Sequence, residues 1–170
     1  VTGIIYPKKV ERLDQTKFEA NLFLELNSNQ TNAKSDLKQA IGLLLQPFSS
    51  ISIAKAVINR LNTSGPLEDK IERHFYDKEK IKTTSIVSYG LKPIVKFSGT
   101  DSFFSLWDNT NKENLLKEND VELLSEYIQY CSDEINNFLT ALKITIDKRK
   151  WSANKNVKNK VLSTTAINGF

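Results

Sequence analysis

The chain has 170 residues, of which 39% are hydrophobic and 26% charged, and its formal net charge at pH 7 is +4. These proportions are typical of globular proteins and not of disordered chains, so we expect a single packed domain over residues 1–170. One cysteine excludes an internal disulfide, and one cysteine with one histidine excludes a zinc site built from those residue types. No apolar run approaches the roughly 18 residues of a membrane span, and we expect a cytoplasmic protein.

The two ends of the sequence favour a piece of a larger protein. The sequence contains no methionine, and its last residues, 166–170, are largely apolar. Near the start, Gly3 to Tyr6 is a β-prone run closed by Pro7, which suits an edge strand. We therefore expect a short N-terminal β-strand that pairs with sequence upstream of Val1.

Helical periodicity dominates the first half of the remaining chain. Apolar residues at helical spacing predict a helix from Thr16 to about Leu26, which the polar residues 27–32 end in an elbow. A second helix is expected from about residue 35 to Pro47, and a third from Ser50 or Ser52 to Leu61. Proline followed by acids then predicts a short helix over residues 66–75.

The second half contains the longest predicted element. Thr83, Thr84 and Ser85 can cap a helix over residues 86–97, which Gly90 and Pro93 would weaken or kink. A short apolar turn over residues 103–107 follows. We expect a long helix over about 120–148, capped by Asn119 or Asp120, whose buried seam comprises Leu124, Ile128, Cys131, Ile135, Phe138 and Leu142. The fold class is thus mainly α, a multi-helix domain with one long helix.

Positive charge is concentrated after this helix, in residues 143–160, which we call the basic segment. It carries seven basic residues and one acid, Asp147, so its net charge is +6 and that of the rest of the chain is −2. Such a segment suits a polyanion, because each lysine or arginine can neutralise a phosphate. The predicted nucleic-acid-binding residues are Lys148, Arg149, Lys150, Trp151, Lys155, Lys158 and Lys160, with Asn154, Asn156 and Asn159 as further donors.

A structural interpretation of the same segment stays open. Lysines often end a long helix because they complement its negative end, and Trp151 can pack on the body of the domain instead of stacking on a base. The two interpretations differ in where they place the indole ring.

No catalytic residue, metal ligand set or cofactor site is predicted. The acids occupy positions typical of helix caps and solvated faces, His74 has no identifiable partner, and Cys131 lies in the seam of the long helix. The hydroxyl clusters at residues 83–85 and 163–165 are best explained as helix caps, although an exposed helix N-terminus there would also suit an anion. Glycine-rich phosphate loops and nucleophile elbows are absent from the sequence.

The polar elbow after the first helix contains Asn27, Asn29, Gln30 and Asn32. Amides of this kind can read base edges or hold a catalytic loop. They also suit the C-terminal cap of a helix, because asparagine tolerates the left-handed conformation.

Residues 23–31, FLELNSNQT, resemble the "F-x-x-I-N-x-x-Q" segment of DGQHR-domain proteins, which include DndB-like proteins of DNA-modification and phage-defence loci. Three later stretches are similar in order and spacing: Leu61-Asn62 with Ser64-Gly65-Pro66-Leu67, residues 103–107, and residues 161–170. The resemblance implies that the Asp-Gly-Gln-His-Arg motif and a ParB-like portion precede Val1. It carries over only Asn27 and Gln30, as residues bordering a site that the missing portion would supply.

The resemblance and the basic segment together predict a DNA-associated binding or regulatory region that is not catalytic alone. DNA is the expected partner, with the missing N-terminal portion or another protein as a further one. Two alternatives stay open: a helical protein-interaction module without nucleic-acid binding, and the non-catalytic half of a ParB-like nuclease or nucleotide hydrolase.

Overall fold

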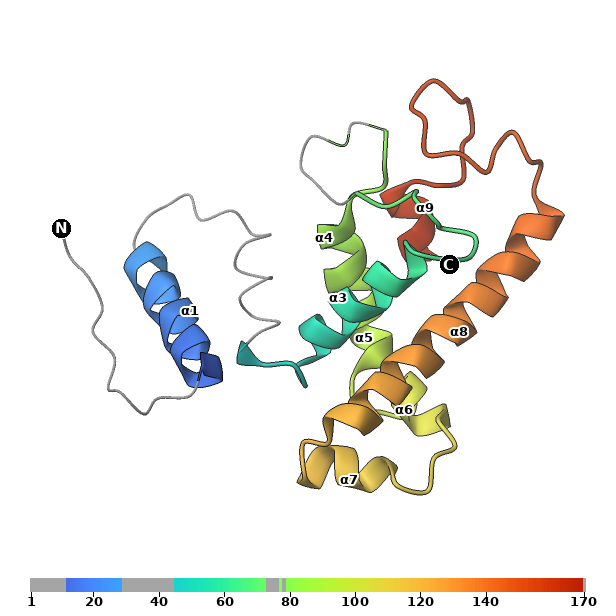
Figure 1. The fold of residues 1–170 in the computed structure, drawn as a ribbon. Coiled ribbons are helices and arrows are strands. Elements are labelled where there is room, and N and C mark those ends of the chain that lie inside the picture. Colours follow the sequence, from blue (N-terminus) through green and yellow to red (C-terminus); the bar gives the residue numbers. More distant parts are fainter. Residues whose placement is uncertain (1–11, 29–44, 73–76, 78, 170) are drawn as a thin grey trace. The chain divides into compact units, whose positions relative to one another are not determined.

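The computed structural model describes residues 12–28, 45–72, 77 and 79–169 (Figure 1). The chain divides into two compact units, Val1–Pro47 and Phe48–Phe170. The described residues are mainly helical, as the periodicity predicts, and contain no strand. The predicted strand Gly3–Tyr6 and most of the predicted second helix lie outside them. None of the helices described has the length and apolar character needed to cross a membrane.

Within the first unit the structure describes one helix, α1, Arg12–Ser28. It begins earlier than the sequence predicts and ends two residues later. In its first turn the Thr16 hydroxyl donates to the carbonyl of Arg12 at 2.9 Å. Asn27 therefore lies in the last turn of a helix.

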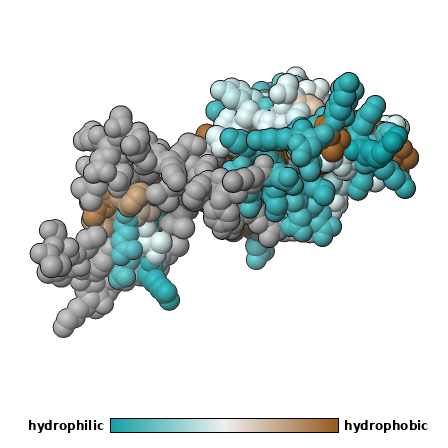
Figure 2. All heavy atoms as spheres, turned by 90° about the horizontal axis from the view of Figure 1, so that it is seen from above, coloured by the Kyte–Doolittle hydropathy of each residue, from teal (hydrophilic) through white to brown (hydrophobic). Residues whose placement is uncertain are grey.

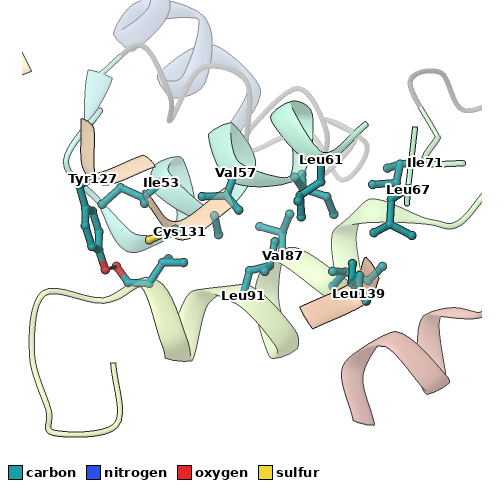
Figure 3. Close-up of a cluster of buried hydrophobic side chains, with 14 of the residues drawn as sticks. Ile53, Val57, Leu61, Leu67, Ile71, Val87, Leu91, Tyr127, Cys131 and Leu139 are labelled. Atoms are coloured by element: carbon teal, nitrogen blue, oxygen red, sulfur yellow. Dashed lines mark hydrogen bonds between the residues drawn. The ribbon is translucent and has the colours of Figure 1, made fainter. Parts of the chain in front are cut away.

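The second unit opens with α3, Ser50–Leu61, which confirms the predicted third helix. Ser49 caps it, because its hydroxyl oxygen accepts the backbone N–H of Ser52 at 3.2 Å. Figure 3 shows Ile53, Val57 and Leu61 of this helix on the side that faces Val87. The helix thus presents one apolar face to the core, as its periodicity indicates.

The predicted helix over 66–75 is wrong for the part that the structure describes. Residues 66–70 form turns, and Asp69 has a positive φ of 52°, which a helix cannot contain. The buried amide of Asn62 explains the turn: its Nδ2 donates to the carbonyl of Ile71 at 3.2 Å, and its Oδ1 accepts the N–H of Ile71 at 3.1 Å. Ile71 then forms an isolated parallel bridge with Ile81.

Three helical pieces follow one another without a break: α4 (Thr83–Ser85), η1 (Ile86–Leu91), which is a π-helix, and α5 (Lys92–Val95). The hydroxyl cluster at 83–85 lies inside the helix, so its predicted capping role is wrong; Lys82 is the N-cap residue and makes no side-chain cap bond. In the π-helix the N–H of Lys92 donates to the carbonyl of Val87, five residues back. This wider turn makes room for the ring of Pro93, which would clash in a regular α-helix.

Two short helices, α6 (Phe103–Leu106) and α7 (Lys112–Lys117), precede the long one. An aromatic cluster joins this region to the core, with Tyr127 at its centre and the rings of Phe97, Phe104 and Trp107 at centroid distances of 5.6, 5.6 and 5.1 Å. The Tyr127 hydroxyl donates to the carbonyl of Val95 at 3.1 Å, so the buried ring leaves no polar atom unpaired.

The long helix α8, Val121–Thr145, is the orange helix of Figure 1. Asp120 caps it, accepting the N–H groups of Glu122 and Leu123 at 2.9 and 3.0 Å, as predicted. Its buried stripe differs from the predicted seam, because Tyr127 and Leu139 are buried whereas Phe138 is 50% exposed. The last helix is α9, Thr164–Gly169, where the Ser163 hydroxyl accepts the N–H of Ala166 at 3.2 Å and so confirms the predicted cap.

Candidate nucleic-acid interface

The basic segment begins in the last turns of α8 and continues into the loop that connects α8 with α9 (Figure 1). The loop is closed at its base, because the N–H of Val161 donates to the carbonyl of Lys150 at 2.8 Å. A loop whose ends meet in this way holds its intervening residues together as one compact unit. The lysines between residues 150 and 161 are therefore presented on a folded loop.

Trp151 packs at the base of this loop. Its side chain is buried, at 8% exposed, and its indole N–H donates to the carbonyl of Pro66 at 3.1 Å. Leu162, on the other side of the closure, is also buried. The structure thus supports packing for Trp151, the interpretation that the sequence left open beside nucleic-acid contact.

The asparagines of the loop shape its turns. The Oδ1 atom of Asn154 accepts the N–H of Asn156 at 2.8 Å, and the Ser152 hydroxyl accepts the N–H of Asn154 at 3.1 Å. Asn159 has a φ of 56°, a conformation that asparagine adopts more readily than most residues. The sequence proposed these amides as phosphate donors, but two of the three have structural roles. The contribution of Ser152 carried no signal in the sequence.

Four of the predicted cations are lysines that lie exposed on or beside the loop. They are Lys148, Lys150, Lys155 and Lys158, and Lys143 in the last turn of α8 is exposed as well. Figure 2, which looks down on Figure 1, shows mainly hydrophilic side chains on that face of the Phe48–Phe170 unit. The exposed lysines give the segment a concentrated positive charge that a phosphate can approach directly from solvent.

The two remaining cations are already engaged. Arg149 binds Asp147 through a salt bridge of 3.1 Å and a second contact at 3.4 Å, and Asp147 also accepts the backbone N–H of Arg149 at 2.9 Å. These hydrogen bonds lower the pKa of Asp147 and raise the pKa of Arg149. The Nζ atom of Lys160 donates to the carbonyl of Ala153 at 3.0 Å and so bridges the loop. The side chain of Arg149 is still 90% exposed and can reach a phosphate, whereas Lys160 is half-buried against the loop.

The polar elbow cannot be assembled into a site from the described residues. Asn27 lies in the last turn of α1, and Gln30 lies outside the part of the chain that the structure describes, as do Asn29 and Asn32. The predicted role of Asn27 and Gln30 beside a shared site stays a prediction.

Other residues considered for chemistry have structural roles or lie outside the described ranges. Cys131 is fully buried, as its seam position predicts, and burial raises the pKa of its thiol to about 12. His74 is outside the described residues. In the ranges that the structure describes, no three His, Cys, Asp or Glu side chains come together as metal ligands would.

Comparison with known proteins gives no relative: no family model, curated protein or solved structure matches the chain. The resemblance to DGQHR-domain proteins therefore stays a prediction from short stretches of the sequence.

Proposed function

We propose that the chain binds DNA through the backbone phosphates, using the exposed lysines of the basic segment. The observation that carries the proposal is the placement of Lys148, Lys150, Lys155 and Lys158 on and beside a loop that is closed by backbone hydrogen bonds and anchored by Trp151. Because these hydrogen bonds restrict the loop, we expect little conformational entropy to be lost when the lysines meet a phosphate backbone.

Charge distribution supports the same conclusion. The basic segment carries +6, whereas the rest of the chain carries −2, so the attraction for a polyanion is local. Contacts of this kind position a protein on DNA without reading its sequence. With Trp151 buried, the proposed mode is electrostatic and includes no stacking on bases, and it assigns no catalytic step to the chain.

The experiment measures fluorescence anisotropy of a labelled DNA duplex over a range of salt concentrations. The test variant replaces Lys148, Arg149 and Lys150 together by glutamine. A control replaces Lys17, Lys92 and Lys117, three exposed lysines outside the segment, and so lowers the net charge equally. We expect the test variant alone to bind more weakly, with a slope of log affinity against log salt that is shallower by roughly one unit for each phosphate that is no longer neutralised.

Two results would contradict the proposal. Equal weakening in both variants would mean that net charge alone attracts DNA, with no role for the loop. Weak binding of the unmodified chain that does not change with salt would favour the protein-interaction module instead. A labelled single-stranded RNA of the same length tests whether the chain prefers the DNA duplex. Flexible lysines alone would bind the duplex and the RNA with similar affinity.

A further inference from the structure

A cavity of about 530 Å³ lies in the Phe48–Phe170 unit, between α3, η1, α5, α8 and α9. Its walls are almost entirely aliphatic and aromatic, and they include Leu61, Leu67, Leu91 and Leu139. In Figure 3 Leu61, Leu67 and Leu139 lie at the same end of the core cluster. Small-molecule sites typically have volumes of roughly 300–1,000 Å³ and apolar walls with few polar groups, and this cavity has both properties.

One polar group inside the cavity lacks a partner. Asn168 lines it, and its Nδ2 donates to the hydroxyl of Ser85 at 3.1 Å, whereas its Oδ1 is buried without a hydrogen bond. An unpaired buried carbonyl destabilises a fold, so such a group needs a hydrogen-bond donor, which a water molecule or a ligand can supply. A ligand hydroxyl both donates and accepts, and so it can pair with this amide.

The backbone of Gly90 lies close to the amide of Asn168. Gly90 belongs to the π-helix η1, and a Cβ atom there would lie 2.9 Å from the Oδ1 of Asn168. Any larger residue at this position would displace the amide. Single π turns in otherwise α-helical segments are frequent at functional sites, and here the π turn positions Tyr89, Gly90 and Leu91 against the cavity.

The entrance restricts the charge of the ligand. Glu134 lines the cavity and is exposed, so its carboxylate repels an anionic headgroup. Tyr89, 76% exposed, and Phe138, 50% exposed, are large apolar rings on the same cavity. An uncharged ligand with an apolar body therefore fits better than a fatty acid.

From these observations we propose that the cavity binds a small uncharged molecule with an apolar body and one hydroxyl, which pairs with the side-chain amide of Asn168. The proposal is independent of DNA binding, because none of the residues that line the cavity belongs to the basic segment.

The test titrates the ¹⁵N-labelled 170-residue chain with 1-octanol and, separately, with octanoate. We expect saturable shifts with 1-octanol in the side-chain amide of Asn168 and the backbone amide of Gly90, and at least tenfold weaker binding of octanoate. Glu134→Gln should narrow that difference, because it removes the repulsive charge. Asn168→Leu should weaken 1-octanol about fivefold, the effect of one net hydrogen bond, while leaving the apolar walls intact.

Asn137→Leu is the matched control for Asn168→Leu, since Asn137 is exposed on α8 and does not line the cavity. Equal weakening in the two variants would overturn the role of Asn168. Shifts that are scattered and do not saturate, or octanoate binding as tight as that of 1-octanol, would overturn the proposal. Concentration-dependent broadening at Gly90 without added ligand would do the same, because it would mean that another protein chain covers the cavity. If Asn168→Leu does not fold, the proposal is still tested by the ratio of 1-octanol to octanoate affinity and by the response of that ratio to Glu134→Gln.

Discussion

Trp151 lies among lysines, where an indole ring suits both base stacking and packing. The hydrogen bond from its indole N–H to the carbonyl of Pro66 favours packing. That carbonyl is distant in the sequence, so no local pattern points to it. For Cys131 the local pattern is sufficient, because a thiol at helical spacing with apolar neighbours is usually buried.

The buried thiol of Cys131 should be chemically silent in the native protein. Burial raises its pKa from 9.0 to about 12, so almost no reactive thiolate is present at neutral pH. We expect labelling by 5,5′-dithiobis(2-nitrobenzoic acid) to be slow in buffer and complete within the mixing time in denaturant. Fast labelling of the native chain at neutral pH would contradict the burial.

The same shift has a consequence for stability. The pKa of the Cys131 thiol is raised in the folded state. The stability that the neutral thiol contributes to the fold is therefore fully present below about pH 9 and is lost as the pH rises toward about 12. Between about pH 8 and about pH 10 the free energy of unfolding should fall by about 1 kcal/mol more than in Cys131→Ala. The comparison with the variant is needed because the pKa of Tyr127 is also raised by burial.

At the scale of elements, the sequence predicted helices well where apolar periodicity and a cap coincide. α3 and α8 have both signals, and their starts were predicted to within a residue or two. The segment after α3 has helix-start signals at Pro66 and Glu68, yet it forms turns. There the side chain of Asn62 replaces helical hydrogen bonds, a tertiary effect that local propensity does not contain.

The amide of Asn62 should therefore hold this segment in place. Asn62→Ala leaves the buried N–H and C=O of Ile71 without their partners, and we expect it to lower the free energy of unfolding by roughly 2–4 kcal/mol. Urea denaturation followed by circular dichroism measures this difference. Asn137→Ala, on the exposed face of α8, is the control and should change it by less than about 0.5 kcal/mol. Similar effects of both substitutions would mean that the turn is held by something other than Asn62.

The cavity and the π-helix show a second limit of predicting local structure from the sequence. Gly90 and Pro93 signal a weakened helix between residues 86 and 97, but the result, a π turn beside an apolar cavity, depends on how α9 packs against it. Periodicity alone also predicts the wrong environment for Phe138. This residue has the spacing of a core residue, yet it lines the cavity with half its surface exposed. Neither feature can be recognised without the packing.

For the whole molecule, composition and periodicity predicted a mainly helical protein, which the described residues confirm. They also predicted one domain over residues 1–170, which stays a prediction; the structure divides the chain into two compact units at Pro47. Proline after a polar stretch marks a turn, but a turn between helices of one domain and a boundary between units have the same local sequence. Which of the two occurs depends on long-range contacts, and in the part of the chain that the structure describes the core cluster lies entirely after Pro47.

This division predicts that residues 48–170 fold without the preceding ones. The fragment contains the whole described core cluster, the cap of α3 at Ser49 and the complete basic segment. We expect its cooperative thermal transition within a few degrees of that of the full chain, and an unchanged salt slope for DNA. A second fragment, 48–163, lacks α9 and so loses the packing of Ile167 against the core and one wall of the cavity. It should melt at a lower temperature. A broad, non-cooperative transition in the 48–170 fragment itself would mean that residues 1–47 are needed to complete this fold.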